Sequence, residues 1–189
     1  MIFLNKFNNK KNIRFSSFRF TLNICEKRKL KNIVETGTSR GKIKFFFFSK
    51  FNWKDGMSTI MLGEYAKFIK GKLHTCDISE KNIINAKKFT AHLKDSINFY
   101  RQDSVEFLKN FKEKIDLLYL DSYDGHDKIK ASEHQLNEAE ASIDKLHINS
   151  LVLLDDKGAK TNLSIDFYKK KGFIVLNETK NQILLSKKI

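Results

Sequence analysis

The sequence predicts an α/β domain built on a mostly parallel sheet with helices on both faces. Short apolar segments alternate with segments whose apolar residues recur at helical spacing, which is typical of strand–helix–strand units. The segment 115–121 (IDLLYLD) is apolar enough for a strand that is covered on both faces. The last two apolar segments are joined by a short polar turn (ETKN), which predicts an antiparallel hairpin at the C-terminus.

Seven strands and five helices are expected after residue 30. The expected strands are 31–36, 72–77, 97–103, 115–121, 150–156, 172–177 and 182–187. The expected helices are 58–69, 79–93, 104–111, 131–146 and 163–170, with Ser79 and Asp103 placed to cap the second and third. Residues 1–30 are basic and aromatic without clear periodicity, so they are interpreted as an N-terminal extension to a domain at 31–189.

Composition indicates a globular protein and excludes some partners. Of the 189 residues, 41% are hydrophobic and 31% are charged, and no apolar run approaches the roughly 20 residues that span a bilayer. The net charge of +14 could attract nucleic acid, but it is spread along a proline-free chain without a basic–aromatic repeat, so no specific nucleic-acid partner is expected. Cys25 and Cys76 have no metal or redox spacing and are interpreted as reduced thiols of a cytoplasmic protein.

Carboxylates recur where the expected strands end. They are Glu35, Asp77, Asp103, Asp121 and the pair Asp155–Asp156. Because the carboxyl ends of parallel strands meet at one edge of a sheet, these acids are expected to converge where such sheets bind ligands. Their mutual repulsion does not stabilise a sheet, which favours a ligand that satisfies them.

The first expected strand runs into a glycine turn with the spacing Gly37-x-x-x-Gly41. A diphosphate would be repelled by Glu35 beside this turn, so a cofactor with a cationic head and a ribose suits it better. Asp77 lies 36 positions after Gly41, or 22 when the Phe-rich stretch 42–55 is left out. The second distance is close to the about 20 residues that separate such a turn from a ribose-binding acid. The stretch 42–55 is therefore interpreted as an insertion, whose aromatic residues pack on the body or a partner subunit, form a lid over the cofactor, or contact a membrane surface.

Four segments resemble successive motifs of the class I S-adenosylmethionine-dependent methyltransferases. They are VETGTSRG (34–41), LHTCD (73–77), RQDS (101–104) and DLLYLDSYDGH (116–126). The sequence is most similar to small-molecule O-methyltransferases of the caffeoyl-CoA and macrocin type. The resemblance implies a Rossmann-like, doubly wound sheet and transfer of a methyl group to a hydroxyl of a sugar or other small metabolite.

The resemblance also assigns roles to residues at the strand ends. The turn around the methionine part of the cofactor would contain Glu35, Gly37, Thr38 and Gly41, with Ser58 after the insertion. Asp77 would accept from the ribose hydroxyls, and Asp103 with Ser104 would lie by the adenine. Asp121 would face the methyl group and the acceptor, with His126 as a candidate base. In metal-dependent relatives an Asp–Asn pair helps to hold the ion, so Asp121, Asp155 and Asp156 would bind Mg²⁺ here.

Other functions stay open at this point. An RNA-modifying methyltransferase on the same fold is favoured by the charge of +14 and the basic N-terminal segment. A nicotinamide-dependent oxidoreductase is disfavoured by the glycine spacing and Glu35, while a non-catalytic binding module would keep the same acids. Aromatic residues in 1–30 and in the insertion suggest a homodimer, and the sequence does not identify the acceptor.

Overall fold

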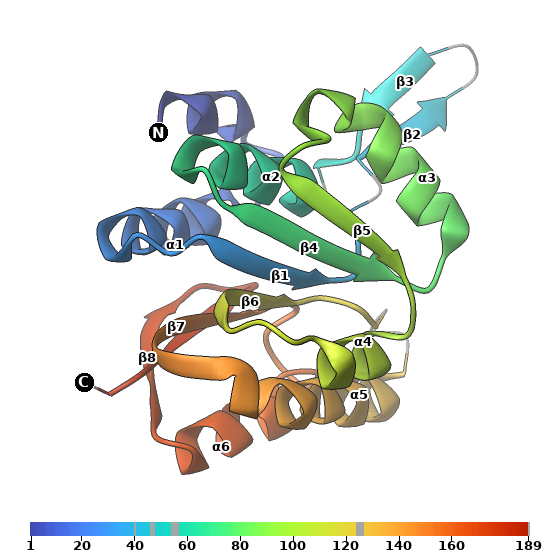
Figure 1. Cartoon of the computed structure of the whole chain (residues 1–189). Helices are drawn as coiled ribbons and strands as arrows, with labels where there is room; N and C mark the ends of the chain where they lie inside the picture. Colours follow the sequence, from blue (N-terminus) through green and yellow to red (C-terminus); the bar gives the residue numbers. More distant parts are fainter. Residues whose placement is uncertain (40, 46–47, 54–56, 124–126, 189) are drawn as a thin grey trace.

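A seven-stranded sheet in the order β5-β4-β1-β6-β7-β9-β8 runs through the molecule (Figure 1). The computed structural model describes residues 1–39, 41–45, 48–53, 57–123 and 127–188. The strands are β1 (Asn32–Thr36), β4 (Lys72–Asp77), β5 (Ile97–Arg101), β6 (Ile115–Leu120), β7 (Leu146–Leu154), β8 (Phe173–Glu178) and β9 (Ile183–Lys187). The first five are parallel, and β9 pairs antiparallel with both β7 and β8. The predicted fold, including the C-terminal hairpin, is confirmed.

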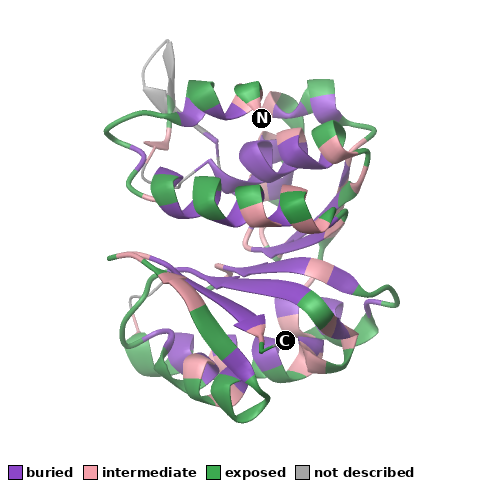
Figure 2. Cartoon of the chain, turned by 90° about the vertical axis from the view of Figure 1, so that its left-hand side faces the viewer, coloured by how far each residue is buried: buried purple, intermediate pink, exposed green. Residues whose placement is uncertain are grey.

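Helices cover both faces of this sheet, and Figure 2 shows the buried strands between two layers with exposed outer surfaces. One layer contains α1 (Phe15–Arg28), α2 (Ser58–Ile69) and α3 (Glu80–Phe89), and the other contains α4 (Ser104–Asn110), α5 (Lys128–Ser142) and α6 (Asn162–Lys170). Short 3₁₀ turns lie at Ile2–Phe7, Ala91–Leu93 and Ile143–Lys145. The helix expected from residue 131 begins earlier, because the Asp127 side chain caps it by accepting from Lys130 N at 3.1 Å.

The N-terminal residues are helical and belong to the core, although the sequence patterns predicted no element before residue 31. Phe18 and Leu22 of α1 are fully buried in the same apolar cluster as Ile33 of β1. The ring of Phe18 meets the ring of Tyr119 on β6 edge-on, with centroids 5.1 Å apart. Apolar residues also occur on the outer side of α1, where Phe20 is exposed, and this blurs the helical period.

Burial of these aromatic residues removes part of the argument for a homodimer. Phe7, Phe15 and Phe18 all lie in the core of the chain itself, so their side chains are not available to a partner subunit. The homodimer stays a prediction.

The two cysteines are free and buried, and among the described residues no helix has the length and apolarity needed to cross a membrane.

The Phe-rich insertion forms an antiparallel hairpin of β2 (Lys42–Phe45) and β3 (Phe48–Phe51). It projects from the body beside α3 (Figure 1). At its base, Asn52 N donates to the carbonyl of Gly41 at 2.9 Å, and the half-buried Trp53 packs against the core. Phe46 and Phe47 of this stretch lie outside the described residues, so whether they pack on the body or form a lid stays open.

Candidate active site

The glycine turn after β1 packs directly against the end of β6. Gly37 has a φ of +84°, and a Cβ at this position would lie 2.2 Å from the backbone oxygen of Asp121. Its N–H donates to the carbonyl of Cys76 at 2.9 Å, which ties the turn to β4 on the other side. Only glycine fits here, because both the positive φ and the close backbone approach exclude a side chain. The turn therefore lies at the centre of the edge formed by the carboxyl ends of the parallel strands.

Glu35 supports this turn from beneath. It is fully buried, and its Oε2 accepts hydrogen bonds from Thr59 Oγ1 at 2.8 Å and Thr75 Oγ1 at 2.6 Å. Both hydroxyls also contact residues of the turn. Thr38 Oγ1 lies 2.9 Å from Thr75 Oγ1, and Ser39 N donates to Thr59 Oγ1 at 2.7 Å. The carboxylate thus fixes the turn through the first residues of α2 and the middle of β4. Contact between Glu35 and the cofactor stays a prediction.

A cavity of about 230 Å³ opens beside the turn, at the carboxyl ends of β4, β5 and β6. It is lined by Gly37, Cys76, Asp77, Ile78, Gln102, Asp103, Ser104, Ser122, Tyr123 and His134. Four residues predicted for the cofactor, Gly37, Asp77, Asp103 and Ser104, therefore share one cleft. A larger cavity of about 690 Å³ beside α3 and β5 contains none of the acidic strand ends, so we do not assign it to the chemistry.

Three other predicted cofactor residues lie near the turn but do not line this cavity. Thr38 takes part in the network below the turn, and Ser58 is buried at the start of α2. Gly41 has a φ of +65°, and a Cβ there would lie 2.0 Å from the ring of Phe89 on α3. Gly41 therefore joins the hairpin to α3, and a role of these three residues toward the methionine moiety stays a prediction.

The two carboxylates in the cleft are oriented by local donors. Asp77 accepts from Ser79 N at 2.7 Å through Oδ1 and from Asn82 Nδ2 at 2.9 Å through Oδ2. Asp103 accepts from Val105 N at 3.0 Å and from the next backbone N–H at 3.1 Å, both through Oδ1. These bonds hold both side chains in place and leave acceptor lone pairs for a ligand. The predicted caps Ser79 and Asp103 are both confirmed.

His134 is a cleft residue that the sequence did not identify. Its Nε2 lies 2.9 Å from Ser104 Oγ, and its ring centroid lies 5.4 Å from that of Tyr123. The contact joins α5 to the start of α4, and no local motif signals it. Beside it, Ser122 Oγ is buried and finds no hydrogen-bond partner within the described part of the chain, so a ligand can satisfy it.

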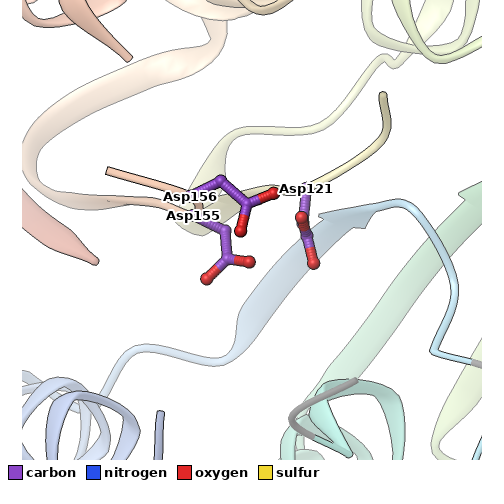
Figure 3. A group of neighbouring side chains, drawn as sticks. All are labelled: Asp121, Asp155 and Asp156. Carbon is purple, nitrogen blue, oxygen red and sulfur yellow. The ribbon is translucent and has the colours of Figure 1, made fainter. Parts of the chain in front are cut away.

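The ends of β6 and β7 bring Asp121, Asp155 and Asp156 together (Figure 3), with ligand atoms within 4.8 Å of one another. Two cations lie among them. Arg14 Nε is 2.7 Å from Asp155 Oδ1, and Arg14 Nη2 is 2.6 Å from Asp155 Oδ2 and 2.8 Å from Asp156 Oδ1. Lys160 Nζ is 3.3 Å from Asp121 Oδ1 and 3.4 Å from Asp156 Oδ2.

These neighbours determine the ionisation of the cluster. Burial raises the pKa of the Asp121 carboxyl well above its usual range, and the charge of Asp155 adds to the rise, while Lys160 opposes it. For Lys160, burial lowers the pKa, but the carboxylates of Asp121 and Asp156 outweigh it and the pKa is raised. Burial likewise opposes ionisation of Arg14, whose pKa is nevertheless raised by Asp155. Both cations are therefore charged at neutral pH.

Of the two predicted catalytic residues, Asp121 is described by the structure and His126 is not. Asp121 lies at the end of β6 next to the glycine turn, and its Oδ2 accepts from the Tyr119 hydroxyl at 3.2 Å. His126 lies outside the described residues, so its role as a base stays a prediction. The donor set also fits Mg²⁺ poorly, because Arg14 and Lys160 already neutralise most of the carboxylate charge that an ion would need.

Comparison with known proteins places the chain in a family. Residues 53–157, more than half of the chain, match the sequence model described as "Methyltransferase domain". The chain belongs to this family. With its fold, that membership makes it a class I S-adenosylmethionine-dependent methyltransferase. No curated protein sequence matches the chain.

Solved structures of other methyltransferases share the fold at low sequence identity. A methyltransferase from Podospora anserina bound to S-adenosylhomocysteine (SAH) is 14% identical, with a TM-score of 0.67 over 92% of this chain and 78% of that one. An O-methyltransferase from Bacillus cereus in complex with SAH is 18% identical, with a TM-score of 0.60 over 92% and 81%. A protein from Clostridium thermocellum described as a putative rRNA methylase is 14% identical, with a TM-score of 0.61 over 95% and 100%.

Proposed function

We propose that this methyltransferase transfers a methyl group from S-adenosylmethionine to a hydroxyl group of a small metabolite such as a sugar. The observation that carries the proposal is the position of Asp121. Its backbone touches the glycine turn, and its carboxylate lies with two fixed cations and does not line the Asp77–Asp103 cleft. A carboxylate beside the cofactor turn can take up the proton of an acceptor hydroxyl.

The cleft supports binding of the adenosine part of the cofactor. Asp77 offers carboxylate lone pairs to the two ribose hydroxyls, and Asp103 with Ser104 offers acceptors to the adenine amine. Ile78 and Tyr123 give the cleft apolar walls for the base. The volume of about 230 Å³ is below the about 300–1,000 Å³ of pockets for whole drug-sized ligands, so the methionine part would extend past Gly37.

Bound S-adenosylmethionine supplies an activated methyl group. The chain then has to align the acceptor oxygen with the methyl carbon, an alignment that is worth roughly 7–11 kcal/mol in well-oriented reactions. Asp121 accepts the hydroxyl proton as the new C–O bond forms and the C–S electron pair stays on sulfur. Tyr119 and Lys160 hold the Asp121 carboxylate in place through contacts at 3.2 and 3.3 Å.

A second candidate is an RNA-modifying methyltransferase, which the net charge of +14 favours. The fold does not decide between them, because its relatives include both an O-methyltransferase and a putative rRNA methylase. We favour the small acceptor because the basic residues are spread along the chain and no RNA-binding module is recognisable in the sequence. A cytoplasmic location and a homodimer are part of this proposal.

The test separates cofactor binding from transfer. Calorimetric titration is expected to show SAH binding to the wild type and to Asp121→Asn, because Asp121 lies outside the adenosine cleft. Tritium transfer from labelled S-adenosylmethionine to a panel of sugars and phenols is expected for the wild type and lost in Asp121→Asn. Transfer to tRNA or rRNA that persists at high salt, with no transfer to any small hydroxyl compound, would establish the second candidate instead.

A further inference from the structure

We propose that Arg14 and Lys160 take the place of the divalent metal ion at the Asp121–Asp155–Asp156 cluster, so that this methyltransferase works without a metal. The inference rests on the proposed function in one respect only: it takes Asp121 to lie where the acceptor binds. It is carried by the contacts of the two cations with the three carboxylates. It assigns an active-site role to the N-terminal segment, which no motif suggested.

Arg14 occupies the oxygens that a metal ion would need. Asp155 is fully buried, and its Oδ1 accepts from Arg14 Nε at 2.7 Å and from Gln182 Nε2 at 2.8 Å, while its Oδ2 lies 2.6 Å from Arg14 Nη2. Mg²⁺ requires near-octahedral oxygen ligands at about 2.0–2.1 Å. To enter, it would have to break this bidentate pair and leave a guanidinium, whose side chain is only 12% exposed, beside a dication.

Lys160 occupies the rest of the cluster. Its side chain is 4% exposed, and its ammonium lies between Asp121 and Asp156 at 3.3 and 3.4 Å. The position of the ammonium between two carboxylates is that of a bridging cation. Because the ammonium is buried and already paired, Lys160 acts on the acceptor through Asp121, as a positioning residue.

Asp156 bridges the two cations. Its carboxylate lies 2.8 Å from Arg14 Nη2 and 3.4 Å from Lys160 Nζ, and the two cations together carry the same charge as one Mg²⁺. The positive charge that a metal ion would bring is therefore already present in the cluster, and an additional dication would lie beside two fixed cations.

The fold fixes Arg14 in this position. Arg14 directly precedes α1, whose Phe18 and Leu22 are fully buried in the core. The neighbouring carbonyl of Ile13 accepts a hydrogen bond from Asn181 Nδ2 at 3.4 Å, which joins the segment to the turn before β9. The guanidinium is therefore delivered by packed backbone and is not a mobile surface group.

The experiment is a titration with Mn²⁺, which prefers the same oxygen ligands as Mg²⁺, followed by electron paramagnetic resonance with and without SAH. Wild-type protein is expected to bind no Mn²⁺ at millimolar concentration. Lys160→Met is expected to bind Mn²⁺ at least about tenfold more tightly, because a fixed charge next to the carboxylates is removed. Lys157→Met is the matched control, since this lysine lies in the same loop but pairs with Glu178, and it should not gain affinity.

Two results would overturn the proposal. One is tight binding of Mn²⁺ to the wild type that Mg²⁺ competes away and that Asp121→Asn abolishes. The other is a folded Lys160→Met protein that binds Mn²⁺ no better than the wild type. Arg14→Gln is a second, independent variant that is expected to gain affinity for Mn²⁺, and its fold is checked by circular dichroism. None of these readouts requires a known acceptor, so failure here and failure of the proposed O-methylation are distinguishable.

Discussion

The two halves of the ligand-binding edge satisfy their acids in different ways. In the half proposed to bind the cofactor (the cofactor half), Asp77 and Asp103 are held by backbone N–H groups and an amide from residues two to five positions away. In the half proposed to hold the acceptor (the acceptor half), Asp155 is held by a guanidinium that lies 141 residues away in the sequence. Asp77 and Asp103 are therefore held by neutral, local donors, whereas the acidic triplet Asp121–Asp155–Asp156 is held mainly by two cations, one of which comes from the far end of the sequence.

This difference determines what each half can do. Neutral donors orient a carboxylate and leave its negative charge for the ligand, which suits recognition of ribose and adenine. Fixed cations remove most of that charge and hold the carboxylates rigidly, which suits a place where a proton and a methyl group must be aligned. The comparison predicts that substitutions in the acceptor half affect stability, whereas those in the cofactor cleft affect affinity.

The largest expected effect comes from breaking the buried ion pair. Arg14→Met leaves Asp155 buried without its cation, so the free energy of unfolding is expected to fall by about 3–5 kcal/mol in urea denaturation. Arg101→Met is the matched control, because its partner Glu80 and Arg101 itself are more than half exposed. That control should change the free energy of unfolding by less than about 1 kcal/mol.

A double variant sharpens this prediction. Arg14→Met/Asp155→Asn removes both charges, so it should be more stable than Arg14→Met alone. If Arg14→Met and Arg101→Met had equal effects, the pair would be no more than a surface contact, and the contrast between the two halves would be wrong.

The glycine turn joins the two halves and gives the next effect. Gly37 and Gly172 both have a φ of +84°, but a Cβ at Gly37 would lie 2.2 Å from the Asp121 backbone oxygen, while nothing lies within 4 Å at Gly172. Both alanine variants carry the same backbone strain, so their difference isolates the clash. Gly37→Ala is expected to lose about 1–3 kcal/mol more stability than Gly172→Ala, measured by thermal and urea unfolding. Equal losses would show that the backbones at Gly37 and Asp121 can separate.

The sequence predicted the arrangement of Asp77 and Asp103 better than that of the acidic triplet for a physical reason. Asp77 and Asp103 follow apolar strands and precede helices, and their partners lie within a few residues, so a local pattern contains the whole arrangement. Arg14 and His134 reach the site through packing of α1 and α5, and the spacing of residues in the sequence does not predict that packing. The sequence identified the acidic triplet but not the two cations among its carboxylates. Without those cations, three neighbouring carboxylates favoured a metal ion.

The cofactor cleft itself predicts a change in affinity with little change in stability. Asp77→Asn keeps an oxygen for Ser79 N but loses the charge that would accept from ribose hydroxyls. SAH affinity is expected to fall by about 1.5–3 kcal/mol, or roughly 10- to 150-fold, in calorimetric titration. Asp95→Asn, an exposed carboxylate before β5 at the opposite end of the strand, serves as the control. A large loss of stability in Asp77→Asn with unchanged SAH affinity would contradict the assignment of the cleft.

The smallest effect concerns His74 in β4. It tests whether the cofactor half excludes buried positive charge. Its Nδ1 lies 3.1 Å from the Tyr100 hydroxyl, and its ring meets Phe111 edge-on at 5.0 Å. Burial lowers the pKa of His74, the charge of Glu113 opposes this, and Lys72 adds to it. Its Nε2 has no hydrogen-bond partner among the residues that the structure describes, so a proton there would be buried without an acceptor.

The sign of the pH dependence follows from that lowered pKa. Below the ordinary histidine pKa of about 6.5 the unfolded chain binds a proton that folded His74 does not, so the free energy of unfolding falls as the pH falls from there toward the folded pKa. His74→Phe keeps an aromatic ring beside Phe111 and removes the titration. The difference in unfolding free energy between His74→Phe and the wild type should therefore shift in favour of the variant on going from pH 7 to pH 5. A pH-independent difference would mean that the imidazolium is stabilised inside the folded protein, and that this half of the sheet does hold buried positive charge.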